Sequence, residues 1–481
     1  MKTNNHSCKK PSARDLTRRE FLGSCAACSV GLSAMGAATP LRKRSDSVSA
    51  NGRDEKAKIR LVFSHIEPEK PTWPNIGYDY EGRKKELIKR FQQGCPNIDF
   101  LPATALNKEE AVCILEADKE VDGYIAYILG IWSGVPQTIV AAGRPTLFVD
   151  DLYAGSGEFL ITFAESKRKG LRVAGVSSSN FEDVIQAVRS FECLKKMQSS
   201  VILQVGGGWG PAEGIEKIYG TKVLTIEFEE LNDAYRKADM SKAKGWADRW
   251  IKNAEKVVEP TRQEIEKSGA MYLGMCDLME RHKARAITIN CLGGFYGGSI
   301  TAYPCLGFFQ MNNDGYVGAC EGDLASTSTM LLIQYLVGRP GYISDPVVDT
   351  SKNQAIYAHC VAPNKVFGPE GPTNAYHIRN HSEDRKGAAV RSLMPLGEMT
   401  TTLLFHSDKK QVIIHQGKSV ANIDEDKACR TKLAVEVKGD IDKLLTTWDE
   451  WGWHRVTFYG DLKRPVQHIA GLLGFGVVEE A

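Results

Sequence analysis

Residues 314–323 have the sequence Asp-Gly-Tyr-Val-Gly-Ala-Cys-Glu-Gly-Asp, a turn and a short apolar strand that ends in two carboxylates. A helix is predicted from Leu324. Carboxyl ends of parallel strands open onto the ligand crevice of an α/β sheet, so Glu321 and Asp323 are expected at such a crevice. Asp323 has a structural role available, because an aspartate in this position caps the following helix. Glu321 has no such local role, and because an unpaired buried charge is costly it needs a partner such as a metal ion.

The segments before and after this stretch alternate between strand-like and helix-like patterns. Strands are predicted at Lys58–Ser64, Asp122–Ile128, Pro145–Asp151, Leu171–Val176, Ser199–Val205, Lys222–Phe228, Ala286–Cys291 and Tyr316–Cys320. Helical segments are predicted at Glu81–Phe91, Phe181–Met197, Glu229–Arg281 (a long charged stretch), Tyr303–Met311 and Leu324–Val337. Strands separated by helices predict parallel sheets with both faces covered.

The pattern changes after about Ser344. Strand-like runs now follow one another with turn residues between them, at Ala355–Cys360, Met399–Phe405, Gln411–His415, Lys432–Val437 and Trp453–Tyr459, before a final helix, Leu462–Leu473. This change predicts a mainly antiparallel domain. The predicted fold class is α/β, with two Rossmann-like α/β domains (58–197 and 198–343) followed by a mainly antiparallel β domain (344–481).

A glycine-rich run, Gly206–Gly210, follows one of the predicted strands. This is where a phosphate-binding loop would lie. The run lacks both the GxGxxG spacing and the Lys-Ser/Thr pair of a P-loop, so a tight turn at the strand end is favoured.

The first residues have the features of an export signal. A basic start leads to Arg18-Arg19 in the context TRREFLG, and a mild apolar stretch then precedes Gly36-Ala37-Ala38. This order predicts a twin-arginine signal peptide over 1–38, a polar linker over 39–57, and a periplasmic protein that the twin-arginine machinery delivers folded. A lipid anchor at Cys25 is disfavoured, because no apolar core fits between Cys25 and the arginine pair.

Replacement of Arg18 and Arg19 by lysine tests this export prediction. The arginine pair is the recognised feature, so the double variant is expected to remain folded in the cytoplasm. Cell fractionation measures the outcome, and unchanged periplasmic delivery would contradict the assignment.

Charge and cysteine content limit the possible partners. Loss of residues 1–38 would remove six basic and two acidic residues and change the formal net charge from +2 to −2. This balance predicts neither nucleic acid nor an anionic membrane as a partner. Nine cysteines remain, an odd number without CxxC spacing. They predict no disulfide framework, and most are expected to be small buried residues.

Side chains that could join Glu321 occur further along the chain. Asp345 ends an apolar run, Asp349 follows four residues later, and His359 and His454 lie in or beside predicted strands. Two carboxylates and an imidazole form a site suited to Mn²⁺ or a similar divalent ion. Any one of these residues alone is more commonly solvated or internally bonded, and Asp349 remains an alternative to Asp345.

From about residue 285 onward, several motifs together resemble the L-fucose/L-arabinose isomerase family. The matching segments, in the expected order, are ITINCLGG (287–294), PCL (304–306), NDGYVGACEGD (313–323), Asp345, AHC (358–360), HSE (381–383), GEMTT (397–401), Trp453-His454 and YGD (459–461). The first half of the chain matches in architecture alone.

The resemblance implies a ketol isomerase that interconverts an aldose and a ketose at a divalent metal ion, usually Mn²⁺. Glu321 and Asp345 correspond to paired carboxylates that both bind the metal and transfer protons. His454 corresponds to the histidine ligand of the last strand, and His359 to a second histidine ligand of the arabinose branch.

Substrate contacts and assembly are also implied by the resemblance. His381 and Glu383, in the HSE motif, are predicted to bind substrate. Family members are trimers or hexamers with the active site near a subunit boundary, so residues from the N-terminal domain of one chain are expected to cover the site of another. Trp132 is a candidate, together with Trp73, Tyr78 and Tyr80. Sugar rings stack on such aromatic faces.

The implied reaction passes through a cis-enediol of the sugar. One carboxylate moves a proton between C2 and C1, and the other moves the hydroxyl proton. The alternative is an exported carbohydrate-binding protein that keeps the fold without turnover. The predicted metal-binding residues favour the enzyme, because sugar binding alone does not require them. The predicted export and the spacing from Asp345 to His359 leave the identity of the substrate open.

Overall fold

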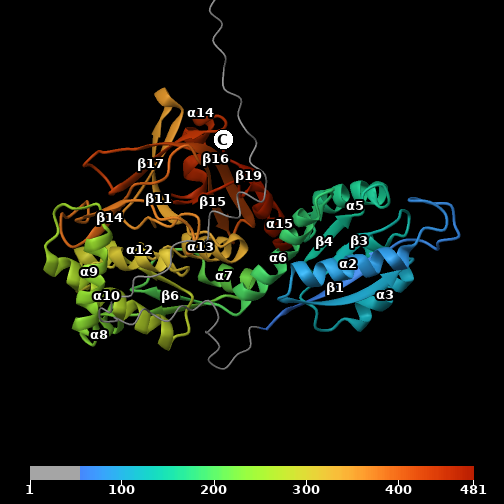
Figure 1. Cartoon of the computed structure of the whole chain (residues 1–481), viewed down its shortest axis with the longest axis horizontal. Helices are drawn as coiled ribbons and strands as arrows, with labels where there is room; N and C mark the ends of the chain where they lie inside the picture. The colour runs from blue at the N-terminus through green and yellow to red at the C-terminus, as the bar shows by residue number, and fades with distance from the viewer. Residues whose placement is uncertain (1–54) are drawn as a thin grey trace, which may run out of the picture. The chain divides into compact units, whose positions relative to one another are not determined.

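The structure is a computed structural model that describes residues 55–481. Parallel sheets covered by helices are followed by a closed, mainly antiparallel barrel, which confirms the predicted fold class (Figure 1). The predicted signal peptide (1–38) and nearly all of the linker (39–57) lie outside the described residues, so the export signal stays a prediction. Within 55–481, no helix is both long and apolar enough to cross a membrane.

The first sheet has five parallel strands in the order β2-β1-β3-β4-β5. The strands are β1 (Ala57–Ser64), β2 (Ile98–Ala105), β3 (Gly123–Ile128), β4 (Thr146–Asp150) and β5 (Val173–Val176). Four of the five were predicted, and β2 was missed. Its exposed positions and Pro102 give no clear apolar pattern, as expected for an edge strand.

Helices cover both faces of this sheet. They are α2 (Tyr80–Gly94), α3 (Lys108–Ala117), α4 (Val135–Ala141), α5 (Ser156–Arg168) and α6 (Phe181–Gln198). Along β3, Ile125 and Tyr127 join the core that includes α2 and α6, whereas Tyr124 joins the core that includes α3 and α4. The alternation of side chains along a strand thus fills two separate cores.

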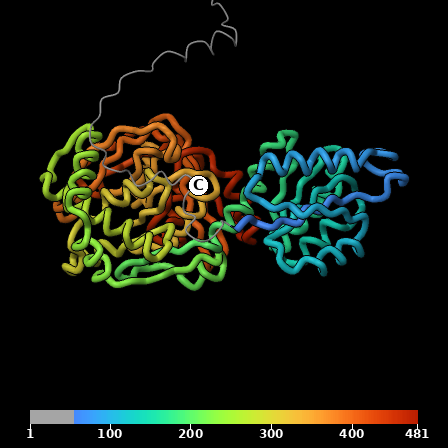
Figure 2. Tube along the Cα trace, turned by 60° about the horizontal axis from the view of Figure 1, so that its bottom comes forward, coloured from blue at the N-terminus to red at the C-terminus, as the bar shows by residue number. Residues whose placement is uncertain are grey.

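The second sheet is also parallel, in the order β10-β9-β6-β7. Its strands are β6 (Val201–Val205), β7 (Lys222–Ile226), β9 (Ala286–Ile289) and β10 (Val317–Ala319). The helices of this stretch are α7 (Ala212–Tyr219), α8 (Phe228–Arg236), α9 (Met240–Asn253), α10 (Arg262–Arg281), α11 (Cys291–Tyr296), α12 (Cys305–Asn313) and α13 (Leu324–Val337). Figure 2 shows the path of the backbone as a tube.

The long charged stretch predicted as helical is in fact three helices, α8 to α10, with a two-residue strand, β8 (Lys256–Val257), between α9 and α10. Asp239 caps α9, and Thr261 begins α10 with a capping box. Local caps and Pro260 therefore divide a segment whose charge pattern alone looks continuous.

The barrel sheet runs in the order β15-β18-β11-β12-β17-β16-β19, and an additional pairing of β15 with β16 closes it. Its strands are β11 (Tyr342–Asp349), β12 (Gln354–His359), β15 (Met399–His406), β16 (Gln411–Asn422), β17 (Thr431–Val437), β18 (Arg455–Tyr459) and β19 (Gly476–Glu479). A small sheet joins β13 (Tyr376–Arg379), β14 (Ala389–Ser392) and β8. The remaining helices are α14 (Ile441–Thr447) and α15 (Lys463–Leu473), with 3₁₀ turns at Thr350–Lys352 and Trp448–Trp451.

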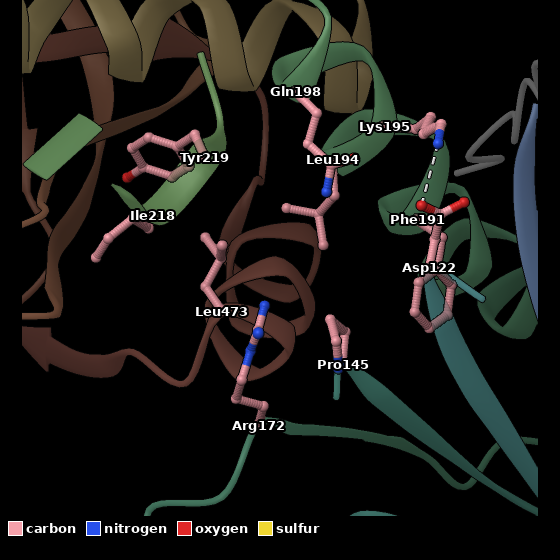
Figure 3. A pocket seen from close by; sticks show the side chains of 10 residues that line it. All are labelled: Asp122, Pro145, Arg172, Phe191, Leu194, Lys195, Gln198, Ile218, Tyr219 and Leu473. Carbon is pink, nitrogen blue, oxygen red and sulfur yellow. Dashed lines mark hydrogen bonds and ion pairs between the residues drawn. The ribbon is translucent and has the colours of Figure 1, made fainter. Parts of the chain in front are cut away.

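A small pocket lies among residues of α6, α7 and α15 and the residues that directly precede β3, β4 and β5 (Figure 3). On one wall, Lys195 Nζ lies 3.2 Å from Asp122 Oδ1. On another, Arg172 Nε donates to the carbonyl of Leu472 at 3.0 Å. The Lys195 and Arg172 side chains are thus bound by partners within the chain, and the lining includes none of the predicted site residues.

Candidate metal centre

Glu321 lies just beyond the carboxyl end of β10, in a left-handed backbone conformation with φ of +66°. This conformation costs a non-glycine residue about 1 kcal/mol. Gly322 follows with φ of +67°, and a Cβ there would lie 2.6 Å from the carbonyl oxygen of Gly207. The backbone is held in this strained turn because two strand ends approach each other closely.

The glycine-rich run after β6 forms the other side of that approach. A Cβ on Gly208 would lie 2.3 Å from the Gly322 carbonyl oxygen. Trp209 makes a backbone bridge with Asp323, and its carbonyl accepts from the Leu324 amide at 3.1 Å. Residues 206–210 are therefore a tight turn that lets the β6 and β10 ends meet, as the sequence favoured.

The barrel brings three further ligand-type side chains to one end of adjacent strands. His454 directly precedes Arg455, which pairs with Ser344 of β11. Asp345, the next residue of β11, pairs with Ala358, the neighbour of His359 on β12. The strand order β18-β11-β12 thus places His454, Asp345 and His359 in a row.

Glu321, Asp345 and His454 form one compact group. His454 Nε2 lies 3.3 Å from Glu321 Oε2 and 3.3 Å from Asp345 Oδ1. One ligand atom from each residue lies within 4.8 Å of the other two. The structure therefore brings together three side chains that are 24 and 109 residues apart along the chain.

Asp323 has a second role that the sequence did not predict. It caps α13 by accepting from the Ser326 amide at 3.0 Å, as expected. Its other oxygen, Oδ2, lies 3.0 Å from His454 Nδ1. A carboxylate that binds one imidazole nitrogen orients the ring so that its other nitrogen faces the group, a common arrangement behind metal-binding histidines.

His359 does not belong to the group of Glu321 and His454. Its Nδ1 lies 3.3 Å from Asp345 Oδ2, and it forms a second group of possible metal ligands with Asp345 and Cys429. The four residues predicted from sequence are thus divided into two groups that share Asp345. Cys429 was treated as one of several structural thiols, because an isolated cysteine carries no motif.

The charges of the cluster depend on one another. Burial disfavours protonation of His454, but the carboxylates of Asp323, Asp345 and Glu321 outweigh burial and raise its pKa to about 11. Burial also disfavours protonation of His359, but the Asp345 carboxylate outweighs burial and raises the pKa of His359 to about 9. Burial favours a neutral Asp345, yet both histidines hold its pKa well below the usual range. The carboxylates therefore require positive charge among them, from imidazole protons or from a cation.

The donor atoms fit a divalent ion. His454 Nε2 and His359 Nε2 are buried and make no hydrogen bond among the described residues, although carboxylate oxygens lie close to His454 Nε2. A buried nitrogen without a hydrogen bond, such as His359 Nε2, is costly unless a partner is bound, and a metal ion can replace the proton that His454 Nε2 shares with the two carboxylates. Two carboxylates and an imidazole suit Mn²⁺ or a similar ion.

Two exposed indole rings flank the group, and neither was predicted as a site residue. Trp453 Nε1 donates to Asp345 Oδ1 at 2.9 Å, while 54% of the residue is exposed. The Trp209 ring lies 5.4 Å from the His454 ring, nearly perpendicular to it, and is 49% exposed. Large rings held half in solvent beside a polar site are suited to contact a sugar.

The other predicted residues lie outside the Glu321 group. Asp349 accepts from Ser351 Oγ and pairs with Lys352 instead. The buried His381 bonds to Asp384 at 3.0 Å, and Glu383 accepts from the Tyr296 hydroxyl.

Trp132 follows β3 in the first sheet, with φ of +68° and 69% of its surface exposed. Its assignment to the site requires a second copy of the chain and stays a prediction, as does the predicted oligomer. The nine cysteines of the described residues are free, and seven of them are buried, which confirms the expectation that most are small buried residues.

Comparison with known proteins gives two related matches. The chain is similar to the sulfoquinovose isomerases of Priestia aryabhattai and Priestia megaterium (strain ATCC 12872 / QMB1551), each 21% identical over 303 residues. The alignments cover 61% of this chain and 67% of each relative. A match to the solved structure of the XylFII molecule covers 51% of this chain and 86% of that chain, at 16% sequence identity. Its TM-score of 0.16 is too low to inform the fold. No family model matches the chain.

Proposed function

We propose that this protein is a metal-dependent ketol isomerase that interconverts an aldose and a ketose. The observation that carries the proposal is the compact group of Glu321, Asp345 and His454, in which one ligand atom from each residue lies within 4.8 Å of the other two. The similarity to two sulfoquinovose isomerases independently supports an isomerase that acts on a sugar.

Glu321, Asp345 and His454 would hold the metal ion. A divalent ion bound there, for which Mn²⁺ is the preferred candidate, would polarise the sugar oxygens and acidify the adjacent C–H bond. Asp323 keeps the His454 ring in the orientation that presents Nε2. Trp453 fixes Asp345 by donating a hydrogen bond to Oδ1.

The two carboxylates differ in how firmly they are held. Asp345 accepts from Trp453 and pairs with both histidines. Within the described residues, the Glu321 carboxylate pairs with His454 alone. We assign Glu321 as the base that moves the proton between C2 and C1 of the sugar, and Asp345 as the group that exchanges the hydroxyl proton. The reaction then passes through a cis-enediol.

The exposed faces of Trp209 and Trp453 bind the carbon skeleton of the substrate. An indole face buries apolar C–H groups of a sugar while leaving its hydroxyl groups to polar partners. Because two relatives are described as sulfoquinovose isomerases, sulfoquinovose is the first aldose to test. L-Fucose and L-arabinose follow from the family resemblance.

A substrate panel with and without metal tests the proposal. The purified chain is treated with a chelator and assayed for ketose formation from sulfoquinovose, L-fucose and L-arabinose, before and after addition of Mn²⁺. Activity is expected on at least one sugar with metal and none without it. Sugar affinity without turnover would identify a carbohydrate-binding protein, and full activity in a metal-free preparation would contradict the proposed site.

A further inference from the structure

Four ligand-type side chains lie in a row across four adjacent barrel strands. His454 precedes β18, Asp345 is on β11 and His359 ends β12. His359 pairs with Thr431, the first residue of β17, and Cys429 lies two residues before it. The strand order β18-β11-β12-β17 therefore extends the row from His454 to Cys429.

Asp345 lies between His454 and His359 in this row, and its two carboxylate oxygens point to opposite sides. Its Oδ1 lies 3.3 Å from His454 Nε2, within the first group. Its Oδ2 lies 3.3 Å from His359 Nδ1, within the second. A carboxylate with one oxygen directed to each side has the arrangement that bridges two cations.

Asp345, His359 and Cys429 each offer one ligand atom, and these atoms lie within 4.8 Å of one another. His359 is 1% exposed, and its Nε2 makes no hydrogen bond in the described part of the chain. The set of a thiolate, an imidazole and a carboxylate differs in kind from the oxygen-rich first group. Thiolate and imidazole ligands favour Zn²⁺ over Mn²⁺.

We propose that Asp345, His359 and Cys429 form a second metal position, specific for a borderline-soft divalent ion such as Zn²⁺, and that Asp345 bridges it to the first. The thiol of Cys429 gives up its proton to solvent when the ion binds, because the thiolate is the ligand form. A buried thiolate beside the Asp345 carboxylate requires a cation for charge balance, which the ion supplies.

The surroundings of Cys429 support a ligand role. The residue is buried, with 9% of its surface exposed. The Ser382 hydroxyl lies 3.9 Å from Cys429 Sγ and donates toward it, so the sulfur has a supporting hydrogen-bond donor. Outer groups of this kind orient metal ligands and raise affinity.

Binding of Co²⁺ to the full chain tests the second position, because a Co²⁺–thiolate bond gives a near-ultraviolet charge-transfer band that nitrogen and oxygen ligands do not give. After treatment with a chelator, the native protein is titrated with Co²⁺ while absorbance and bound metal are measured. We expect about two ions per chain, one of which produces the thiolate band. One ion per chain without the band would overturn the proposal.

Three variants locate the band. Cys429→Ser is expected to lose the band and to weaken binding at this position by about 100-fold or more. Glu321→Gln is expected to keep the band, since Glu321 belongs only to the first group. Cys305→Ser is the matched control, because Cys305 is buried but in neither group, and it should keep the band. A band that persists in Cys429→Ser would overturn the proposal, and if that variant does not fold, the native titration still decides.

The second position shares Asp345 with the proposed isomerase site, but the two proposals can be tested separately. A protein with the thiolate band but no isomerase activity would support the second position and reject the isomerase. A protein that isomerises sugar with one bound ion and no band would support the isomerase and reject the second position.

Discussion

Glu321→Gln is expected to lower the rate of sugar isomerisation by about 10²–10⁴-fold, the usual contribution of a general base. Glutamine keeps the size of the side chain and an oxygen that can remain near the metal, but it cannot accept the C2 proton. Bound metal, measured by elemental analysis, should fall much less than activity. The rate loss therefore reports on proton transfer rather than on assembly of the site.

Proton transfer has a direct isotopic readout. In D₂O, the native enzyme should place deuterium at the carbon that receives the proton, at least in part, because a carboxylate exchanges its proton with solvent. The variant should form almost no deuterated product. Turnover without any deuterium would indicate a hydride shift, and deuterium transfer that survives Glu321→Gln combined with Asp345→Asn would place the chemistry elsewhere.

Asp349→Asn is the control for carboxylate removal. Asp349 lies four residues from Asp345 at the end of the same strand, but it pairs with Lys352 and Ser351 rather than with the cluster. Its substitution should leave both metal content and activity close to native. A loss comparable to that of Glu321→Gln would mean that the ligand assignment on β11 is wrong.

The elements that the sequence predicts well are those whose signals are local. Helix α13 begins and ends where it was predicted, because Asp323 caps its start and Gly338 adopts the left-handed conformation at its end. The strands β3 and β4 lie in continuous apolar runs because both faces of the sheet are covered.

The barrel illustrates what local patterns do not determine. Individual strands were predicted, but closure depends on the pairing of β15 with β16 and on the order of all the strands between them. Residues that contact through such pairings are far apart in the sequence. Asp323 and His454, for example, are 131 residues apart, so the capping role of Asp323 was predicted and its imidazole contact was missed.

In the candidate site, too, local sequence signals predict some residues, whereas others depend on the pairing of strands that are distant in the sequence. Glu321 could be singled out because a carboxylate at a strand end lacks a local partner. The assignment of His359 to a different group from His454 depends on barrel register, which places Cys429 beside it. No spacing rule connects an isolated cysteine at 429 to a histidine 70 residues earlier.

Glu480→Gln is expected to destabilise the protein by about 3 kcal/mol at neutral pH. Glu480 pairs with the fully buried guanidinium of Arg455, with Nη2 to Oε1 at 2.8 Å, and with His415 Nδ1 at 2.9 Å. Glutamine leaves the buried Arg455 charge without its counter-ion. Equilibrium unfolding of the full chain in urea measures the change.

The same pair holds the segment that carries His454, the proposed metal ligand. Arg455 donates to the carbonyl oxygens of Gly452 and His454, each at 3.0 Å, and its guanidinium lies 4.2 Å over the Trp448 ring. Arg455 is therefore a positioning residue for His454. Glu480→Gln should also weaken metal binding at temperatures where the variant remains folded, as isothermal titration would show.

The stability that Glu480 contributes should depend on pH, because its pKa is lowered in the folded state. Burial favours the neutral form of Glu480, but His415 and Arg455 outweigh it and lower its pKa to about 2, from 4.5. A depressed pKa in the folded state means that the contribution to stability is complete above about pH 4.5 and is lost as the pH falls toward 2. The difference in unfolding free energy between native protein and Glu480→Gln should therefore shrink across that window.

The neighbouring residue supplies the control. Glu479 pairs with Lys463 at the surface, where the Glu479 side chain is 56% exposed, and such pairs contribute little. Glu479→Gln should leave the unfolding free energy within about 0.5 kcal/mol of native at every pH. If both variants lose the same stability, or if the Glu480→Gln difference stays constant from pH 7 to pH 2, then the ion pair with Arg455 does not hold the His454 segment in place. In that case the orientation of His454, the proposed metal ligand, would have to depend on Asp323 alone.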